Sequence, residues 1–531
     1  MMRKTSTTSR TEKRSSNERG SRETHHKILK HPSTRTKRSV RSRQYLSQNK
    51  IRQNMSIEEG QTETRQSQIV ECENDKSNST SAQQGTLSLS LKKGPVINLR
   101  RCMYKILDDI ATEFGMIPVK DEDDSWDVHW ADASVSSNLS RTMQVFQRTN
   151  HFPGMANLES KAFLAHHLNR MRNYFPDDYS FFPRSWSIPW QADDLYKHVK
   201  TNKEVYIFKP TRGAEGKGIK LFATEDEARR IIYQDSVVQV YVPNLLLMDG
   251  YKFDLRVYVL ITMIDPLRIY VYNNGLVRLA TYPYAPPNSS NLNNQFMHLT
   301  NYSINKNSEN YKESPEHGSK RDFVVLNSWF LKEGLDSTKL WSDIDDVIIK
   351  TITSVYPILK DKYEELFPDH YNHNVSACFE MLGMDILIDD KMKPYLLEVN
   401  RSPSFNISGV IDERVKTPLL RDTFRLVNLG QNRRPFANNL DDQNKKTGST
   451  NLDDDTQKNC DQNGNESDNY QTFGNNDHLD NNCIKEQIKW EQRNNGNYRL
   501  IYPSRDSYLY AKFIHHIFSI PEASGKRLGS K

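Results

Sequence analysis

The chain has 531 residues and a formal net charge of +6 at pH 7, and its hydrophobic residues and glycines together make up about 40% of it. This length allows roughly three or four domains, but ordinary globular chains contain about 45 to 50% of such residues, so part of the chain is not expected to fold. The five scattered cysteines, none at CxxC spacing, argue against a disulfide scaffold and a zinc module, and the sequence predicts an intracellular protein without a membrane span.

Residues 1–95 form the first segment with a distinct composition. They are rich in Ser, Thr, Arg, Lys, Asn and Gln, and residues 1–55 carry 16 Lys or Arg against 3 acids. Such a segment buries too little apolar surface to offset its conformational entropy, so we expect a disordered basic tail. The tail could bind nucleic acid or another acidic surface, and a solvated tail without such a role is the alternative.

Residues 96–436 are dense in apolar and aromatic side chains and predict one large folded domain. Its first chemical motif is VYIFKPTRGAEGKGI, an apolar strand that delivers Lys209, followed by a loop with Gly213, Gly216 and Gly218. Glycines let backbone N–H groups approach phosphate oxygens, and lysine adds positive charge. The loop has neither of the common nucleotide-binding fingerprints, so an ordinary surface turn is the alternative.

Several secondary-structure elements follow in the same domain. A capping-box pattern at Thr224 and Glu227 predicts the start of a helix. Three apolar runs, FDLRVYVLITM, LRIYVY and LVRLATY, predict β-strands joined by turns at 265–266 and 273–275. Apolar residues then recur every three or four positions over 341–359 and predict one long amphipathic helix.

The first of these strands carries alternating charge. Because side chains alternate along a strand, Lys252, Asp254 and Arg256 share one face, and Phe253 and Leu255 share the opposite one. The charged face predicts either a ladder of ion pairs exposed to solvent or a row of fixed charges beside the phosphate-binding loop.

The most specific motif is GMDILIDDKMKPYLLEVNRSPSF, two apolar strands around a polar turn. A turn centred between Lys391 and Met392 places Asp385 opposite Glu398, and Asn400 then points to the same side. Hard oxygen ligands of this kind suit Mg²⁺ bound together with substrate phosphates. The alternative is a pair of acids neutralised by nearby arginine or lysine.

The last two segments differ from the folded domain. Residues 437–484 hold 12 Asn and 10 acids against 3 Lys and predict an acidic low-complexity linker. Residues 485–531 recover aromatic side chains, and approximate helical spacing over 509–518 predicts a short ordered element there.

Together, the loop with its lysine, the charged strand face and the oxygen-rich hairpin predict an α/β (α+β) protein that holds ATP between two β-rich layers, which is the ATP-grasp architecture. Such enzymes activate a carboxylate as an acyl phosphate and let an amine attack it.

Seven runs between residues 96 and 432 resemble, in content and order, the tubulin tyrosine ligase-like family, and within it the tubulin polyglutamylases: HFPGM, FFPRSW, GYKFDLRVYVLIT, DPLRIYVYNNGL, FMHLTNYSINK, SACFEMLGMDIL and YLLEVNRSPSF. The run NYRLIYPS also resembles the segment that follows the catalytic core in that group. The resemblance implies an ATP-grasp fold of the tubulin tyrosine ligase type.

The resemblance also implies roles for individual residues. ATP would be bound by Lys209, Glu215, Gly216, Gln239, Tyr241, Lys252, Asp254, Thr300 and Asn301. Mg²⁺ would be held by Asp385, Glu398 and Asn400. The reaction centre would be lined by Arg256 and His298, and the incoming glutamate would be received by Arg278, Tyr302, Ser303, Lys320 and Lys416. Two positions depart from the family pattern: Glu215 replaces the usual Gln, and Arg401 the usual His of EVNHSPSF.

The function implied is that of an ATP- and Mg²⁺-dependent tubulin polyglutamylase, a monomer of the cytoplasm and cytoskeleton, with the cilium or basal body as candidate places. Its partners would be tubulin, microtubules and free L-glutamate. Because tubulin tails are acidic, the charge of the basic tail predicts that it contributes to microtubule attachment, and docking by the C-terminal element of residues 485–531 is the alternative. The rivals are a catalytically weak microtubule-binding protein that keeps the fold and a sister ligase that adds glycine. A nucleic-acid-binding role is the weakest, because only the basic tail supports it.

Overall fold

The computed structural model describes residues 94–121, 125–133, 136–431, 433–434 and 479–519. The expected basic tail lies outside these residues except for Gly94 and Pro95, and the expected linker lies outside them up to residue 478. No helix among the described residues combines the length and hydropathy that crossing a membrane requires.

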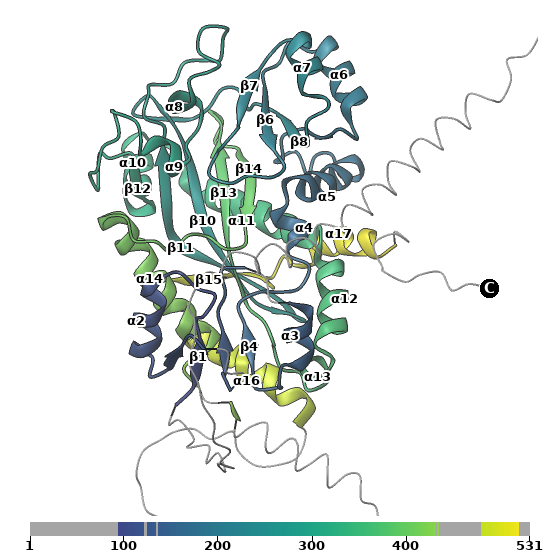
Figure 1. The fold of residues 1–531 in the computed structure, drawn as a ribbon, viewed down its shortest axis with the longest axis vertical. Helices are drawn as coiled ribbons and strands as arrows, with labels where there is room; N and C mark the ends of the chain where they lie inside the picture. Colours follow the sequence, from purple (N-terminus) through teal and green to yellow (C-terminus); the bar gives the residue numbers. More distant parts are fainter. Residues whose placement is uncertain (1–93, 122–124, 134–135, 432, 435–478, 520–531) are drawn as a thin grey trace, which may run out of the picture. The chain divides into compact units, whose positions relative to one another are not determined.

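The described chain alternates between helices and strands (Figure 1). The helices are α2 (Lys105–Glu113), α3 (Ser137–Thr142), α4 (Ala156–Glu159), α5 (Lys161–Tyr174), α6 (Ala192–Thr201), α7 (Glu225–Ile231), α8 (Gln295–His298), α9 (Tyr302–Asn305), α10 (Phe323–Lys332), α11 (Ser337–Thr353), α12 (Tyr356–Leu366), α13 (Pro368–Asn372), α14 (Val410–Val427), α16 (Leu479–Arg493) and α17 (Tyr508–Ser519). The strands are β1 (Val96–Asn98), β2 (Ile117–Val119), β3 (Val128–His129), β4 (Arg148–Thr149), β5 (Ser185–Ile188), β6 (Tyr206–Pro210), β7 (Lys220–Phe222), β8 (Ser236–Val240), β9 (Leu247–Met248), β10 (Tyr251–Ile264), β11 (Leu267–Leu279), β12 (Lys320–Asp322), β13 (Glu380–Ile388), β14 (Pro394–Asn400) and β15 (Tyr498–Tyr502).

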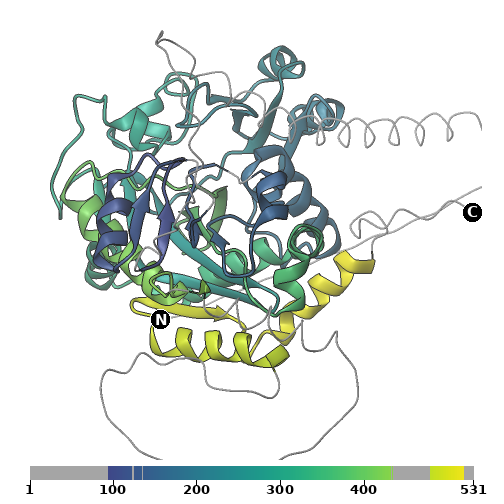
Figure 2. The ribbon, with the colours of Figure 1, turned by 60° about the horizontal axis from the view of Figure 1, so that its bottom comes forward.

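The largest sheet has the strand order β12-β11-β10-β13-β14, with every neighbouring pair antiparallel. Strand β15 pairs with β11 along the half that β12 leaves unpaired, so the C-terminal segment completes this sheet. Figure 2 shows this segment in yellow, as a helix, a strand and a second helix.

The two faces of β10 pack into different cores. Leu255, Val257 and Val259 point into a core shared with α10, α11 and α12, whereas Tyr258 and Leu260 point into a core shared with α2 and α14. This alternation follows from the period of two in a strand. The face of β10 that carries Tyr258 and Leu260 has charged residues at the start of the strand and buried apolar residues further along. The charge therefore lies at one end of the sheet.

Two smaller sheets precede the large one in the sequence. Strands β2-β1-β3-β4 form a parallel sheet, and β5-β8-β6-β7 form an antiparallel one. The sheet of β5, β8, β6 and β7 brings Lys209 on β6 near Gln239 on β8, since Gln239 pairs with Ile207, two residues from Lys209 on the same face of β6. The glycine loop connects β6 to β7.

The turn expected at 273–275 is wrong, whereas 265–266 does form the turn between β10 and β11. Residues 267–279 are one strand with a bulge, because Val257 pairs with Gly275 while Val259 pairs with Val271. The Asn274 side chain accepts from the backbone N–H of Phe323 at 3.0 Å, and this long-range bond holds the bulge where a turn was expected.

Two other boundaries also differ from the sequence expectations. The long helix expected over 341–359 is two helices, because α11 ends at Thr353 and Pro357, in the first turn of α12, cannot donate a backbone hydrogen bond. Helix α16 begins at Leu479, inside the expected linker. The expected helix start at Thr224 is confirmed, with both hydrogen bonds of the capping box present.

Candidate functional site

Charged side chains cross the large sheet from strand to strand. Arg278 on β11 pairs in register with Lys320 on β12 and with Asp254 on β10. Two residues along β10, Arg256 pairs with Asp385 on β13, which in turn pairs with Glu398 on β14. Cross-strand neighbours lie about 5 Å apart, so these side chains lie next to one another across five strands. We call them the charged row: Lys320, Arg278, Asp254, Arg256, Asp385 and Glu398.

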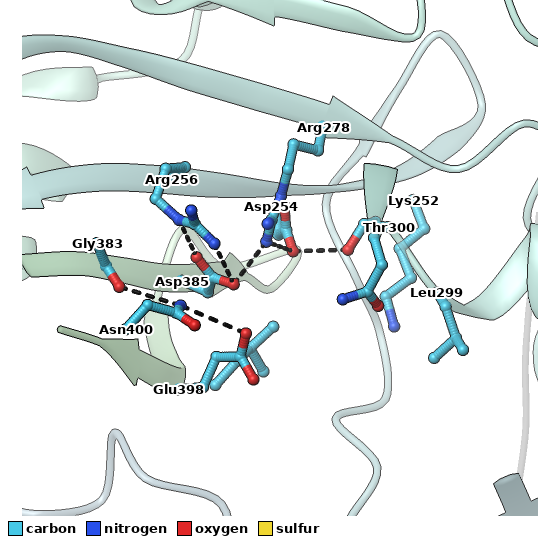
Figure 3. A network of polar contacts seen from close by, with 12 residues as sticks. Lys252, Asp254, Arg256, Arg278, Leu299, Thr300, Gly383, Asp385, Glu398 and Asn400 are labelled. Carbon is cyan, nitrogen blue, oxygen red and sulfur yellow. Dashed lines mark hydrogen bonds and ion pairs between the residues drawn. The ribbon is translucent and has the colours of Figure 1, made fainter. Parts of the chain in front are cut away.

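Ion pairs connect the middle of this row (Figure 3). Arg256 donates to the two carboxylate oxygens of Asp385 at 2.5 and 3.2 Å, and Arg278 donates to Asp385 at 2.7 Å. Arg278 also binds both oxygens of Asp254, at 2.7 and 2.6 Å. The hydroxyl of Thr300 completes the chain by donating to Asp254 at 2.6 Å. The charged face is therefore a buried, paired network and not a solvent-exposed ladder, since Asp254 and Asp385 are each 2% exposed.

The hairpin register places Asp385 opposite Glu398, as the sequence predicts, but by a different route. At the turn end of the hairpin, Ile386 pairs with Leu396, which centres the turn on Lys391. A one-residue bulge at Leu397 then shifts the register and restores the Asp385 and Glu398 pair.

The two carboxyl groups of this pair titrate differently. The charges of Arg256 and Arg278 hold the pKa of Asp385 below its usual value, although burial opposes this. Burial, followed by the nearby charge of Asp385, raises the pKa of Glu398. Asp385 is thus the ionised member, and Glu398 is the member whose ionised form is disfavoured, although the charges of Lys209 and Arg256 partly oppose this.

Two buried lysines have neutral oxygen acceptors. The ammonium of Lys209 donates to Oε1 of Gln239 at 2.8 Å. That of Lys252 donates to the hydroxyl of Tyr241 at 2.9 Å and to the carbonyl of His298 at 2.7 Å. Burial lowers the pKa of Lys209 to about 8 and that of Lys252 to about 7. Desolvated ammonium groups with neutral acceptors favour the binding of an anion.

His298 belongs to the lysine end of this site. Its ring nitrogens lie 3.4 Å from the hydroxyl of Tyr241 and 3.4 Å from Oδ1 of Asn291. Burial and the charge of Lys252 lower the pKa of His298 to about 4, so the imidazole is neutral at physiological pH. Arg256, expected to line the reaction centre with it, contacts Asp385.

A pocket lies where the charged row of the large sheet meets the small sheet of β5, β8, β6 and β7. Its apolar wall includes Ile207, Ile219, Leu299, Leu387 and Leu397. The predicted site residues that line it are Lys209, Gln239, Tyr241, Lys252, Asp254, Arg278, His298, Thr300, Asn301, Asp385 and Glu398. Segments from 207 to 398 thus converge on one cavity that combines apolar surface with cations and carboxylates, as expected of a site for a nucleotide.

The hairpin oxygens suit a magnesium ion shared with phosphates. Asn400 donates to Oε1 of Glu398 at 3.4 Å, so amide and carboxylate lie together on one side of β14. Within the described ranges, no three His, Cys, Asp or Glu side chains gather into a metal site of their own. Mg²⁺ in proteins is commonly bound by a few oxygen ligands of the protein together with phosphate oxygens of the substrate, and two carboxylates and an amide would supply the protein ligands.

The glycine loop is attached to α9. The hydroxyl of Ser303 donates to the backbone carbonyl of Glu215 at 2.8 Å. Gly216 has a φ of +76°, and a Cβ there would lie 3.0 Å from Asn301 and 2.6 Å from Ile304. This position therefore requires glycine for both conformation and space.

The two residues that depart from the family pattern form ion pairs outside the pocket lining. The carboxylate of Glu215 lies 2.8 Å from Lys217, and the guanidinium of Arg401 lies 2.8 Å from Glu159. Neither substitution removes a residue of the pocket.

The remaining predicted residues form a second cluster around a carboxylate that the sequence analysis missed. Asp412 lies 2.8 Å from the ammonium of Lys320 and 2.9 Å from that of Lys416. The ring of Tyr302 faces Lys320, with 3.9 Å from the ammonium to the ring centroid. Asp412 and Lys416 lie four residues apart on one helix, and this i,i+4 spacing, together with the position at the helix start, could have suggested Asp412.

Comparison with known proteins gives consistent results. Residues 138–435 match the model of the tubulin-tyrosine ligase family. The chain is 40% identical over 427 residues to the tubulin polyglutamylase TTLL13 of Mus musculus, covering 80% of this chain and 51% of that protein. It is 44% identical over 359 residues to the tubulin polyglutamylase TTLL6 of Mus musculus, covering 67% and 43%. It is 36% identical over 438 residues to the tubulin polyglutamylase TTLL7 of the same organism, covering 80% and 48%. The chain thus spans about half the length of these curated relatives.

Proposed function

Since the chain belongs to the tubulin-tyrosine ligase family, we propose that it is a tubulin polyglutamylase, an ATP- and Mg²⁺-dependent ligase. It joins free L-glutamate to the γ-carboxyl of glutamates in the acidic tails of tubulin, through an acyl phosphate of that carboxyl. Relatives that carry this name support the proposal. We further propose residues 96–436 as the catalytic domain, with the protein acting as a monomer on microtubules of the cytoskeleton.

One observation carries the proposal. Two buried lysines that donate hydrogen bonds to neutral oxygens line the same pocket as residues of the charged row. Lys209 and Lys252 offer two desolvated cations to a polyphosphate. Asp385 and Glu398 offer oxygens to a cation at the same pocket. A site with both features fits the binding of a nucleotide together with its metal.

The residues divide the chemistry between them. Lys209 and Lys252 bind phosphate oxygens, while Arg256 and Arg278 hold Asp385 ionised and in place. Mg²⁺, when bound, neutralises charge on the transferring phosphoryl group. Lys320 pairs with Arg278 across the sheet, and Lys416 on α14 shares Asp412 with Lys320. The two ammonium groups receive the carboxylates of the incoming glutamate.

ATP affinity is expected to fall as pH rises through about 7 to 8. Lys252 and Lys209 have pKa values lowered to about 7 and about 8, so both ammonium groups lose their protons in this range, and a neutral amine attracts phosphate less. Calorimetric titration with a non-hydrolysable ATP analogue across the range measures this. Lys252→Arg, which stays charged, should remove the lower of the two transitions. Affinity that is constant over the range would contradict these roles.

The proposed function is tested by incubating the purified chain with tubulin, ATP and Mg²⁺, together with glutamate, glycine or tyrosine separately. The masses of the tubulin tails should increase by glutamate units with glutamate alone. Increments with glycine would favour the sister ligase. No increment with any amino acid would favour a microtubule-binding protein without activity.

A further inference from the structure

Asp412 is a buried carboxylate outside the pocket lining, and it contacts two lysines and a serine. It is 1% exposed and lies in the first turn of α14, where the helix dipole favours negative charge. Besides the two lysines, it accepts from the backbone N–H of Ser408 at 3.1 Å and from the hydroxyl of Ser408. A single buried carboxylate therefore joins β12, α14 and the segment between β14 and α14.

The two lysines around Asp412 have few other acceptors. Lys320 donates to the hydroxyl of Ser408 at 3.1 Å, and Lys416 donates to the backbone carbonyl of Asn406 at 2.6 Å. The side chain of Lys320 remains 12% exposed, whereas Lys416 is 5% exposed. Without Asp412, two ammonium groups would face one another in a largely buried place, and they would repel.

We infer that Asp412 is a positioning residue, whose carboxylate fixes the ammonium groups of Lys320 and Lys416 as a pair that recognises an amino acid with two carboxylates. This inference rests on the proposed function, in which the two lysines receive the incoming glutamate. The carboxylate of Asp412 already accepts from both lysines and from Ser408, and it would repel the carboxylates of the amino acid, so it acts through the lysines.

A purely structural role makes a different prediction. If Asp412 only ties β12 to α14, its loss lowers stability without a selective effect on one substrate. If it positions the lysines, its loss raises the KM for glutamate and leaves both kcat and the KM for ATP unchanged, because the ATP pocket does not include this cluster.

The test uses the full chain with Asp412→Asn, Asp412→Glu and Ser408→Ala, and with Glu413→Gln as a matched control at an exposed neighbour on the same helix turn. Initial rates of glutamate attachment to a tubulin-tail peptide are measured against glutamate and against ATP, and thermal melting monitors folding. Asp412→Asn should raise the KM for glutamate about tenfold or more, since it removes two charge-assisted contacts. Asp412→Glu should recover part of this, and Glu413→Gln should behave as the unmodified chain.

If Asp412→Asn does not fold, Ser408→Ala tests the inference. It removes one hydroxyl that donates to Asp412 and accepts from Lys320, and it should raise the KM for glutamate about threefold without changing the KM for ATP. An unchanged KM for glutamate in the folded variants, or an equal rise in both KM values, would overturn the inference while the proposed function stands. An unmodified chain without glutamate-dependent turnover would overturn both.

Discussion

Replacing Glu398 by glutamine is expected to abolish glutamate attachment while the melting temperature stays constant or rises slightly. The substitution removes a carboxylate charge from the proposed Mg²⁺ ligands without changing volume. The raised pKa of Glu398 shows that its ionised form is disfavoured in the folded state, so at neutral pH the charge costs stability, and this cost disappears as pH falls through the raised value. A neutral glutamine relieves that cost at every pH.

The measurements are single-turnover glutamate attachment and thermal unfolding near neutral pH. Glu365→Gln serves as a matched control, because the side chain of Glu365 is 69% exposed and pairs only with Arg141 at 3.7 Å. The control should retain activity. Glu398→Gln with the activity of the unmodified chain would refute the assignment of this carboxylate to the metal.

Arg278→Ala is expected to destabilise the fold by about 3 kcal/mol and to abolish activity, because removing one partner of a buried ion pair leaves uncompensated charge. Arg278 contacts both Asp254 and Asp385, each of which is nearly inaccessible to water. Denaturant unfolding measures the loss. Lys320→Ala should cost far less stability, because Lys416 still compensates Asp412.

A double-mutant cycle provides the control for Arg278. Asp385 keeps its ion pair with Arg256 in the Arg278→Ala variant, so Asp254 is the carboxylate that loses its guanidinium partner. Asp254→Asn in this background removes that charge and should restore part of the stability. If the two substitutions add without coupling, the ion pairs of Arg278 do not stabilise the fold as argued.

Much of the site could be predicted because β-strand geometry is regular. The period of two placed Lys252, Asp254 and Arg256 on one face, and this is confirmed. The pairing of Asp385 with Glu398 is also confirmed, but the turn centre from which it was counted is wrong, and the bulge at Leu397 restores the pair. The family match also confirms the expected α/β (α+β) fold of the tubulin tyrosine ligase type, with its ATP-grasp architecture.

Other features depend on partners distant in the sequence, which local patterns do not report. The run at 273–275 has the composition of a turn, but Phe323 and the C-terminal segment hold it within β11. The ion pairs of Arg278 with two acids could not be foreseen, because Asp385 lies 107 residues away. The contact of Asp412 with Lys320 on β12 also lacks a local signal, because the two residues are 92 positions apart, whereas the i,i+4 pair of Asp412 with Lys416 is local.

The most direct test of the central claim is the stoichiometry of the reaction on one tubulin-tail peptide. The purified chain is supplied with ATP, Mg²⁺ and glutamate, and attached glutamate, ADP and inorganic phosphate are measured together. An acyl phosphate formed from ATP and displaced by the amine of glutamate predicts one ADP and one phosphate for each glutamate joined. Release of AMP and pyrophosphate, or attachment of glutamate without consumption of ATP, would contradict the account.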